Sequence, residues 1–149
     1  MSNAYLKRMP AGFPGDVSRK AEATVEAGLM GATVAFGAPV KMDEGKLVAL
    51  SGASDAVYGF VVRPYPTMGS AAVSGSIQDV LRRGYMTVKL TQGTAAKGSQ
   101  VYVRHTAETG KAVGDIEAAA VEGKTLAVPG CLFMGEADGM GNVELSYNL

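Results

Sequence analysis

The amino-acid sequence predicts an all-β protein, and two observations carry this prediction. The stretch 84–104 contains two runs in which apolar and polar residues alternate, with an apolar face formed by Met86 and Val88 in the first and by Val101 and Val103 in the second. Alternation with a period of two, rich in β-branched and aromatic residues, is typical of half-buried strands. The chain also has 20 glycines, which indicate many turns and bulges. We expect the two runs to be neighbouring strands with one face on a core and one in water.

The remaining elements follow along the chain. Residues 39–50 are predicted to form a hairpin around the tight turn Asp43-Glu44-Gly45. Residues 57–62 are nearly all apolar, as expected of a strand covered on both faces. Residues 115–123, with an aspartate at the start and a glycine at the end, have the pattern of one short helix at most. The other expected segments are strands at 23–27, 33–36, 126–128, 132–134 and 143–149, and an exposed loop at 67–79.

The first 20 residues are predicted to form an extended arm ahead of a single β domain over 21–149. Two prolines and two glycines between positions 10 and 15 prevent a helix, and Tyr5 and Phe13 are apolar anchors. Fully extended, 20 residues span roughly 70 Å, so the arm can reach a neighbouring molecule. The arm contains one acidic residue, Asp16, and four basic residues, so its net charge is +3. The basic residues are Lys7, Arg8, Arg19 and Lys20.

The composition bounds the class of protein. A chain of 149 residues can bury a sizeable core without disulfides, and its zero net charge gives no case for a nucleic-acid partner. The single cysteine, Cys131, lies in an apolar run and is expected to be a small buried hydrophobe. No apolar stretch approaches the ~20 residues of a membrane helix, and the start lacks the apolar centre of a signal peptide. The region 105–149 is acidic, so the two ends of neighbouring copies can attract each other, although solvated surface charge is the ordinary role of such residues.

Catalysis finds little support in the residues. The only histidine, His105, stands far along the chain from Cys131, and no second polar partner for a nucleophile is visible. A metal site of soft ligands would need more cysteine or histidine than the chain has. We therefore expect no enzyme activity, no metal and no cofactor. Two other classes stay open: a small-ligand or glycan-binding β-module, which should show exposed aromatic residues, and a hydrolase using Cys131 or a serine.

Several segments together carry a family resemblance. They are GFPGDVSRK at 12–20, AFGAPVK at 35–41, VYGFVVRPYPT at 57–67, the stretch 84–104 and VPGCLFMGEADGMGNVELSYNL at 128–149. In their order and spacing these segments resemble the structural cement (capsid decoration) proteins of tailed bacteriophages. The resemblance covers most of the chain, and its departures lie at 68–79 and 105–124.

The resemblance implies a function and a body plan. The protein would sit on the outer surface of the icosahedral head in the virion, after synthesis in the host cytoplasm. There it would bridge neighbouring major capsid subunits and stabilise the shell against DNA pressure. A homotrimer is favoured and a homodimer is possible. The implied body is a small antiparallel β-barrel, tulip-like or sandwich body with an extended N-terminal arm. The residues expected to contact the capsid or a neighbouring copy are Tyr5, Lys7, Arg8, Phe13, Arg19, Lys20, Arg63 and Tyr65.

Overall fold

The computed structural model describes residues 12–67 and 69–149, and over them the protein is all-β, as predicted. The arm residues Tyr5, Lys7 and Arg8 lie outside the described residues. Helical structure in the described part is limited to a 3-10 turn, η1 (Lys20–Glu22), and no helix there is long and apolar enough to cross a membrane. The strands are β1 (Thr24–Leu29), β2 (Val34–Ala35), β3 (Pro39–Asp43), β4 (Lys46–Val48), β5 (Gly59–Val61), β6 (Ala71–Ala72), β7 (Ile77–Gln92), β8 (Gln100–Arg104), β9 (Ile116–Glu117), β10 (Thr125–Phe133) and β11 (Asn142–Tyr147).

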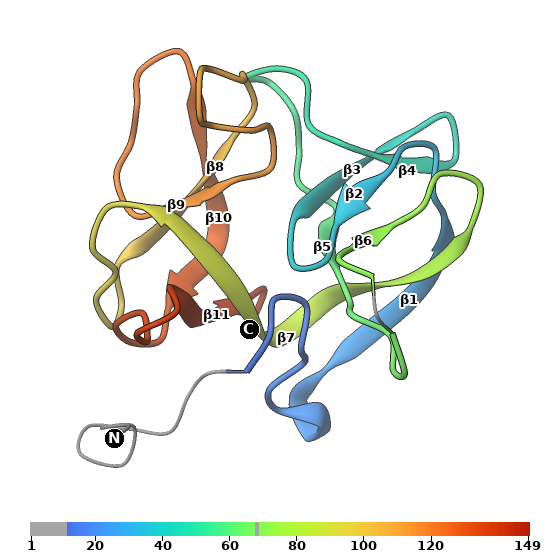
Figure 1. Ribbon diagram of the computed structural model, residues 1–149, viewed down its shortest axis with the longest axis horizontal. Helices are drawn as coiled ribbons and strands as arrows, with labels where there is room; N and C mark the ends of the chain where they lie inside the picture. Colours follow the sequence, from blue (N-terminus) through green and yellow to red (C-terminus); the bar gives the residue numbers. More distant parts are fainter. Residues whose placement is uncertain (1–11, 68) are drawn as a thin grey trace.

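One long strand, β7, runs through the molecule and belongs to two lobes (Figure 1). Its second half pairs with β11, β11 pairs with β10, and β10 pairs with β8. Strand β9 lies between β8 and β7, antiparallel to the first and parallel to the second. The pairing therefore closes into a five-stranded barrel, in agreement with the barrel among the predicted forms.

The first half of β7 organises the other lobe, which nearly closes as well. Strands β1 and β5 flank this half of β7, β3 follows β5, and β4 follows β3 in the predicted hairpin. The last junction, between β4 and β1, is a single bridge from Met30 to Leu47. The short pair β2–β6 lies beside these strands. We call this the near-closed lobe and the other the closed barrel.

A bulge in the middle of β7 separates its two halves. Thr24 faces Arg83 but Val25 faces Leu81, so Arg82 is an extra residue in β7. Two residues later Gly84 has φ +132°, and a Cβ there would lie 3.0 Å from the Cα of Ala23. A glycine is needed at this place because the start of β1 passes so close. The bulge lets β7 change direction as it leaves one lobe and enters the other (Figure 1).

Two hydrophobic clusters fill the two lobes. Val88, Val101, Val103 and Leu145 are all 0% exposed in the core of the closed barrel, which confirms their predicted burial. Cys131 is equally buried on β10, also as predicted. The smaller cluster of the near-closed lobe is centred on residues from β3, β4, β5 and the first half of β7. The alternation in the sequence therefore identified the core of the closed barrel.

The predicted pairing of the two runs within 84–104 is wrong, and so is the predicted helix. Ile116 pairs with Leu90 of β7 on one side and with Val103 of β8 on the other, so β9 separates the two strands. Ile116 and Glu117 are buried there as a two-residue strand, inside the segment that was predicted to be helical. A helix of so few residues is only weakly favoured by local propensity. The backbone hydrogen bonds that Ile116 and Glu117 make to both β7 and β8 are therefore enough to hold the segment as a strand.

Three smaller expectations also change. The predicted loop 67–79 includes β6 and the start of β7, and the two predicted strands of 126–134 are one strand, β10, with an irregularity around Pro129. The face of β7 and β8 expected to lie in water is covered at Thr87 and Arg104, both 0% exposed. The N-terminal segment covers Thr87, and an ion pair accounts for Arg104, as described below.

Candidate functional site

The described part of the predicted arm lies against β7. The Gly15 N–H donates to the Thr87 carbonyl over 2.9 Å, the Thr87 N–H donates to the Asp16 carbonyl over 2.8 Å, and the Ser18 N–H donates to the Tyr85 carbonyl over 3.1 Å. Val17 faces Met86 in an antiparallel bridge. Residues 15–18 are thus bonded to β7 of the same chain through three backbone hydrogen bonds, and they form a fixed start for whatever precedes Gly12.

This docked segment brings three of the predicted contact residues together. The Tyr65 hydroxyl donates to Asp16 Oδ1 over 2.6 Å, and the Phe13 N–H donates to Asp16 Oδ2 over 2.8 Å. The hydrogen bond to Asp16 also raises the pKa of Tyr65. Phe13 and Tyr65 remain 57% and 64% exposed. We name the set Phe13, Asp16, Arg63 and Tyr65 the aromatic surface.

Arg63 fixes the geometry of the aromatic surface. Its Nε donates to the Pro14 carbonyl over 3.0 Å, and its backbone N–H donates to the Gly15 carbonyl over 2.8 Å. Its guanidinium carbon lies 5.6 Å from the ring centre of Phe13 and 5.2 Å from that of Phe36, within the range of cation–π contacts. Gly15 has φ +92°, and a Cβ there would lie 2.8 Å from the Arg63 nitrogen, so only glycine fits.

The other two described contact residues lie apart from the aromatic surface. Arg19 stacks on Tyr85, 4.0 Å from the ring centre, and forms an ion pair with Glu144 over 3.0 Å. The hydrogen bond to Glu144 raises the pKa of Arg19. This pair joins the basic start to the acidic end within one chain, whereas the sequence suggested an attraction between copies. Lys20 is exposed in η1 and has no ion pair among the described residues.

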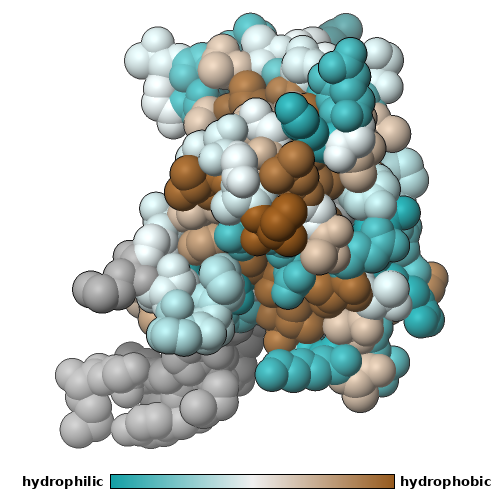
Figure 2. Space-filling view, turned by 90° about the vertical axis from the view of Figure 1, so that its right-hand side faces the viewer, coloured by the Kyte–Doolittle hydropathy of each residue, from teal (hydrophilic) through white to brown (hydrophobic). Residues whose placement is uncertain are grey.

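A second exposed surface lies on the near-closed lobe. Val73 and Ile77 are 61% and 65% exposed, in and just after the turn that leads into β7, and Val25 on β1 is 40% exposed. Figure 2 shows hydrophobic residues gathered among polar ones over this side of the molecule, which is the right-hand side of Figure 1. Exposed apolar groups that cluster in this way are typical of contact surfaces.

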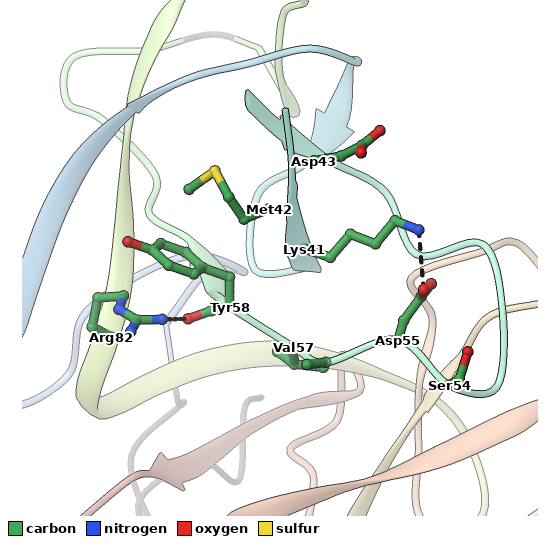
Figure 3. Close-up of a pocket in the computed structure, with 9 residues that line it drawn as sticks. Lys41, Met42, Asp43, Ser54, Asp55, Val57, Tyr58 and Arg82 are labelled. Atoms are coloured by element: carbon green, nitrogen blue, oxygen red, sulfur yellow. Dashed lines mark hydrogen bonds and ion pairs between the residues drawn. The ribbon is translucent and has the colours of Figure 1, made fainter. Parts of the chain in front are cut away.

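A shallow cavity of about 490 Å³ opens between β3, residues 54–58 and β7 (Figure 3). A small ligand, the alternative suggested by the sequence, would need a cavity of this kind. Three of the four charged side chains of the cavity are engaged within the protein: Lys41 pairs with Asp55 over 3.0 Å, and Arg82 donates to the Tyr58 carbonyl and stacks on that ring at 3.7 Å. The fourth, Asp43, has no ion pair among the described residues. Burial opposes ionisation of Asp55, but the N–H groups of Ser51 and Gly52 and the Lys41 ammonium together lower its pKa to about 2. These charges hold the loop in place.

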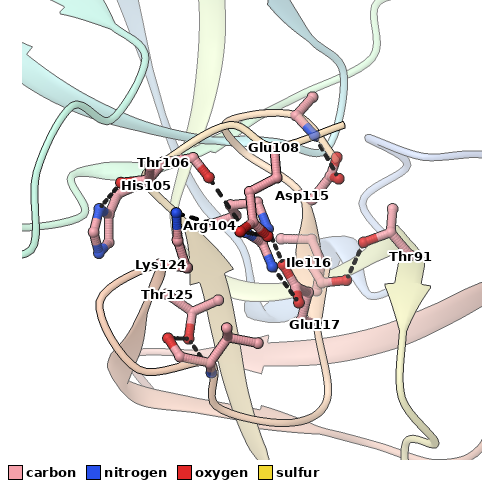
Figure 4. Close-up of polar contacts among 12 residues, drawn as sticks. Thr91, Arg104, His105, Thr106, Glu108, Asp115, Ile116, Glu117, Lys124 and Thr125 are labelled. Atoms are coloured by element: carbon pink, nitrogen blue, oxygen red, sulfur yellow. Dashed lines mark hydrogen bonds and ion pairs between the residues drawn. The ribbon is translucent and has the colours of Figure 1, made fainter. Parts of the chain in front are cut away.

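A buried ion network lies at one end of the closed barrel (Figure 4). Arg104 donates to both carboxylate oxygens of Glu117, over 2.6 and 3.2 Å, and to Glu108 over 3.2 Å. Lys124 pairs with the second oxygen of Glu108 over 3.3 Å. The hydrogen bond to Glu117 raises the pKa of Arg104, and the hydrogen bond from Lys124 lowers that of Glu108. The network joins the irregular segment 105–124 to β8 and β9.

His105 and Cys131, the two residues considered for catalysis in the sequence, are both buried but lie in different surroundings. Neighbouring Thr106 hydrogen-bonds His105 Nδ1 over 2.9 Å, and Nε2 has no partner among the described atoms. Figure 4 shows the ring turned away from the Arg104 network. Cys131 is buried on β10, and its burial raises the pKa of the thiol, so the thiol is not activated. No group of three or more metal-ligating acids, histidines or cysteines occurs in the described part.

Comparisons with known proteins identify relatives of this chain. The model of a family described as structural cement protein (E217 gp24/Pam3 gp6) matches residues 1–148. A chain in the structure of the capsid of Myoviridae phage XM1 is similar in fold, with a TM-score of 0.78 and 20% sequence identity. That similarity covers 99% of this chain and 97% of the other. No curated protein sequence matches the chain.

Proposed function

Because the chain belongs to the structural cement protein family of phage capsids, we propose that it binds the outer surface of the assembled head and bridges neighbouring major capsid subunits. Its role is structural and not catalytic, and its place is on the virion. Bridging stabilises the shell by mass action, because a protein that binds only the assembled state lowers the free energy of that state. The protein thereby reinforces the head against internal DNA pressure.

The observation that best supports this proposal is the aromatic surface. Phe13 and Tyr65 are exposed, yet their positions are fixed by Asp16 and Arg63. Tyrosine and arginine dominate the residues that contribute most to protein–protein affinity. A surface whose geometry is set before binding loses less side-chain entropy when the partner arrives. The major capsid protein is the proposed partner of this surface.

The residues ahead of Gly12 extend the proposed contact. Tyr5 offers an apolar anchor, and Lys7 and Arg8 offer positive charge, with Arg19 and Lys20 next to the docked segment. Ordering a residue costs ~1–2 kcal/mol of backbone entropy, so Tyr5 alone does not hold this segment and backbone pairing with a partner is needed. The proposed partners are the capsid and a second copy of the chain, in a homotrimer or, less favoured, a homodimer. Neither nucleic acid nor membrane is a proposed partner.

The experiment is co-sedimentation of the purified protein with expanded phage shells. The wild-type protein is expected to sediment with the shells and to saturate. The double variant Phe13→Ala/Tyr65→Ala is expected to bind at least tenfold more weakly, about 1.4 kcal/mol. Leu132→Ala serves as the matched control, because Leu132 is 40% exposed on β10, which β11 separates from β7 and its docked segment. Absence of wild-type binding would refute the proposed function, and equal binding of the double variant would remove the aromatic surface from it.

A further inference from the structure

Strand β1 has an outer edge whose backbone groups can be assigned from the hydrogen bonds at its end. The Met30 N–H donates to the Ser76 carbonyl and the Met30 carbonyl accepts from Gly75, so Met30 points toward the chain entering β7. The Gly31 N–H donates to Leu47, away from β7. Because backbone groups alternate along an extended strand, the N–H and C=O groups of Val25 and Ala27 also point away from β7.

These four backbone groups form an open edge. Strand β1 pairs with β7 alone, and the bridge to β4 occurs beyond its end. Val25 and Ala27 are exposed, and no partner for their outward groups occurs among residues 12–67 and 69–149. Proteins usually protect such an edge with lysine, proline or a covering element, and Thr24–Leu29 contains neither lysine nor proline. An exposed edge of this kind accepts an additional strand.

The face beside the open edge has a definite pattern. Val25, Ala27 and Leu29 share one face of β1, and they lie opposite Leu81, Asp79 and Ile77 of β7. The face therefore has apolar positions at both ends and an exposed acid, Asp79, in the middle beside the small Ala27. It belongs to the side of the molecule on which hydrophobic residues gather in Figure 2. A matching strand would have apolar, basic and apolar residues at alternate positions.

A second copy of β1 does not match this pattern. Two β1 strands related by a two-fold axis would join Val25 of one copy to Ala27 of the other, which uses all the open backbone groups. That register places Glu26 directly opposite Glu26 of the partner copy. Like charges in directly opposite positions destabilise a strand pair. We therefore exclude β1–β1 pairing in this register.

The segment 5–9, with the sequence YLKRM, matches the pattern. In an extended strand Tyr5, Lys7 and Met9 share one face, which gives apolar, basic and apolar side chains in turn. The order is the same in either strand direction. Lys7 is long enough to extend across Ala27 toward Asp79. No acidic residue precedes Gly12, so nothing in this segment repels Asp79.

The short length of chain between Met9 and Gly12 favours another copy as the donor of the segment. Gly12 lies near Thr87, where a Cβ on it would be 3.6 Å from the threonine Oγ1, and residues 15–18 run from there toward the start of β1. Val25 faces Leu81, six positions earlier on β7, or roughly 20 Å along the strand at ~3.3 Å per residue. The three residues from Met9 to Gly12 span at most about 11 Å. Measured along β7, the path is about twice what those three residues span, so we take a second copy as the donor for the open edge.

From these observations we propose that residues 5–9 of one copy add as a strand to the open edge of β1 in a second copy, with Lys7 paired to Asp79. This inference rests on the self-association in the proposed function and names its site. Each copy donates one segment and accepts one, so the contacts close into a ring of three copies, the favoured form, or into a reciprocal pair. Binding to the shell is a separate contact, made by the aromatic surface.

The test compares full-length variants by sedimentation equilibrium in the absence of shells. Ala27→Pro removes the outward N–H of Ala27 and leaves the pairing of β1 with β7 intact. The matched control is Ala53→Pro, which places the same residue at the second position of the exposed turn 52–55, outside β1. We expect Ala27→Pro to weaken self-association at least about tenfold and Ala53→Pro to leave it unchanged. Circular dichroism checks that both variants fold.

Charge reversal tests the occupant of the edge. Lys7→Glu and Asp79→Lys should each weaken association, and the double variant Lys7→Glu/Asp79→Lys should restore it, because the pair is re-formed with opposite signs. A mixture of Ala27→Pro and Lys7→Glu proteins should form 1:1 complexes only, since one protein retains the donor segment and the other the edge. Wild-type protein that is monomeric in solution, or equal association of Ala27→Pro and Ala53→Pro, overturns the proposal. Loss in Ala27→Pro without rescue by the double charge reversal rejects residues 5–9 as the occupant. Normal shell binding with any of these results leaves the proposed function intact.

Discussion

The two lobes share β7 but differ in how the outer edges of their strands are paired. In the closed barrel five strands pair around a full circle, so each strand of that ring has a partner on both sides, although β9 contributes only two residues. In the near-closed lobe the circle is completed by one bridge between Met30 and Leu47. The backbone groups of Val25 and Ala27 remain open at the junction. The comparison separates a lobe built for stability from a lobe that keeps bonding capacity for a partner.

The distribution of exposed apolar side chains agrees with this difference. A strand that is paired on both sides has few backbone groups left for a partner chain. Among the described residues, the closed barrel exposes three large apolar side chains: Leu132, Met140 and Leu149. The near-closed lobe and the docked N-terminal segment expose twice as many: Phe13, Val25, Met42, Tyr65, Val73 and Ile77. Buried charge follows the opposite trend, since the fully buried Arg104–Glu117 pair lies in the closed barrel. The open edge thus belongs to the near-closed lobe, and the aromatic surface joins that lobe to the segment docked on the second half of β7.

The sharpest way to break the closed barrel is to leave a charge unpaired inside it. Arg104→Met should lower the free energy of unfolding by about 3–5 kcal/mol, because Glu117 is then buried without its partner. The measurement is urea denaturation followed by circular dichroism. Arg104→Met/Glu117→Leu is the control, and it should recover most of the loss because both charges are removed. A loss below about 1 kcal/mol in the single variant, as for an exposed pair, would contradict the assignment of a buried ion pair.

The two cores can be compared with one substitution in each. Leu145 and Leu47 are 0% and 1% exposed, so Leu→Ala at either place should cost about 2–5 kcal/mol. We expect Leu145→Ala to lie in the upper part of that range, because a closed ring relaxes less around a cavity. Leu47, beside the single bridge, should lie in the lower part. Equal losses in thermal or urea unfolding would mean that the junction at Met30 and Leu47 is as rigid as a full ladder.

The smallest expected effect concerns Asp55 in the near-closed lobe. Its pKa in the folded protein, about 2, is below the ordinary value of 3.8, so the unfolded chain binds more protons between these values. The stability that the carboxylate contributes is therefore complete above about pH 4 and is lost as the pH falls toward 2. Asp55→Asn should cost about 1 kcal/mol at pH 7 and should remove this part of the acid dependence. Identical pH profiles of stability for the two proteins would show that the loop does not depend on the charge.

The sequence predicted the features that depend on local alternation. Val88, Val101 and Leu145 each belong to a run in which every second residue is apolar. This pattern occurs wherever one face of a strand packs on a core. The same rule failed at Thr87 and Arg104, which occupy positions expected in water. Thr87 is covered by residues 15–16, and Arg104 is enclosed with Glu117, a residue 13 positions away. Alternation identifies the two faces of a strand, but it does not say what later covers the second face.

The candidate surfaces were only partly accessible from the sequence. Phe13, Arg63 and Tyr65 could be selected as contact residues, but nothing local indicated that Tyr65 meets Asp16, 49 positions away. The open edge of β1 was not predicted either. It depends on which side of β1 meets β7 and on where β4 stops, and both are properties of the tertiary pairing. The strand propensity of β1 alone does not distinguish a paired edge from a free one.

The pairing of residues 15–18 with β7 also determines how the molecule bears force. The segment runs antiparallel to β7, and its bonds to Tyr85 and Thr87 lie side by side across the strand axis. A force on the chain ahead of Gly12, directed along that axis, loads these hydrogen bonds in shear. All of them then bear the force at the same time, and they do not break one after another. The tension then passes through β7 into its ladder with β11 and around the ring. Any partner that pulls on the segment ahead of Gly12 therefore pulls against the whole closed barrel.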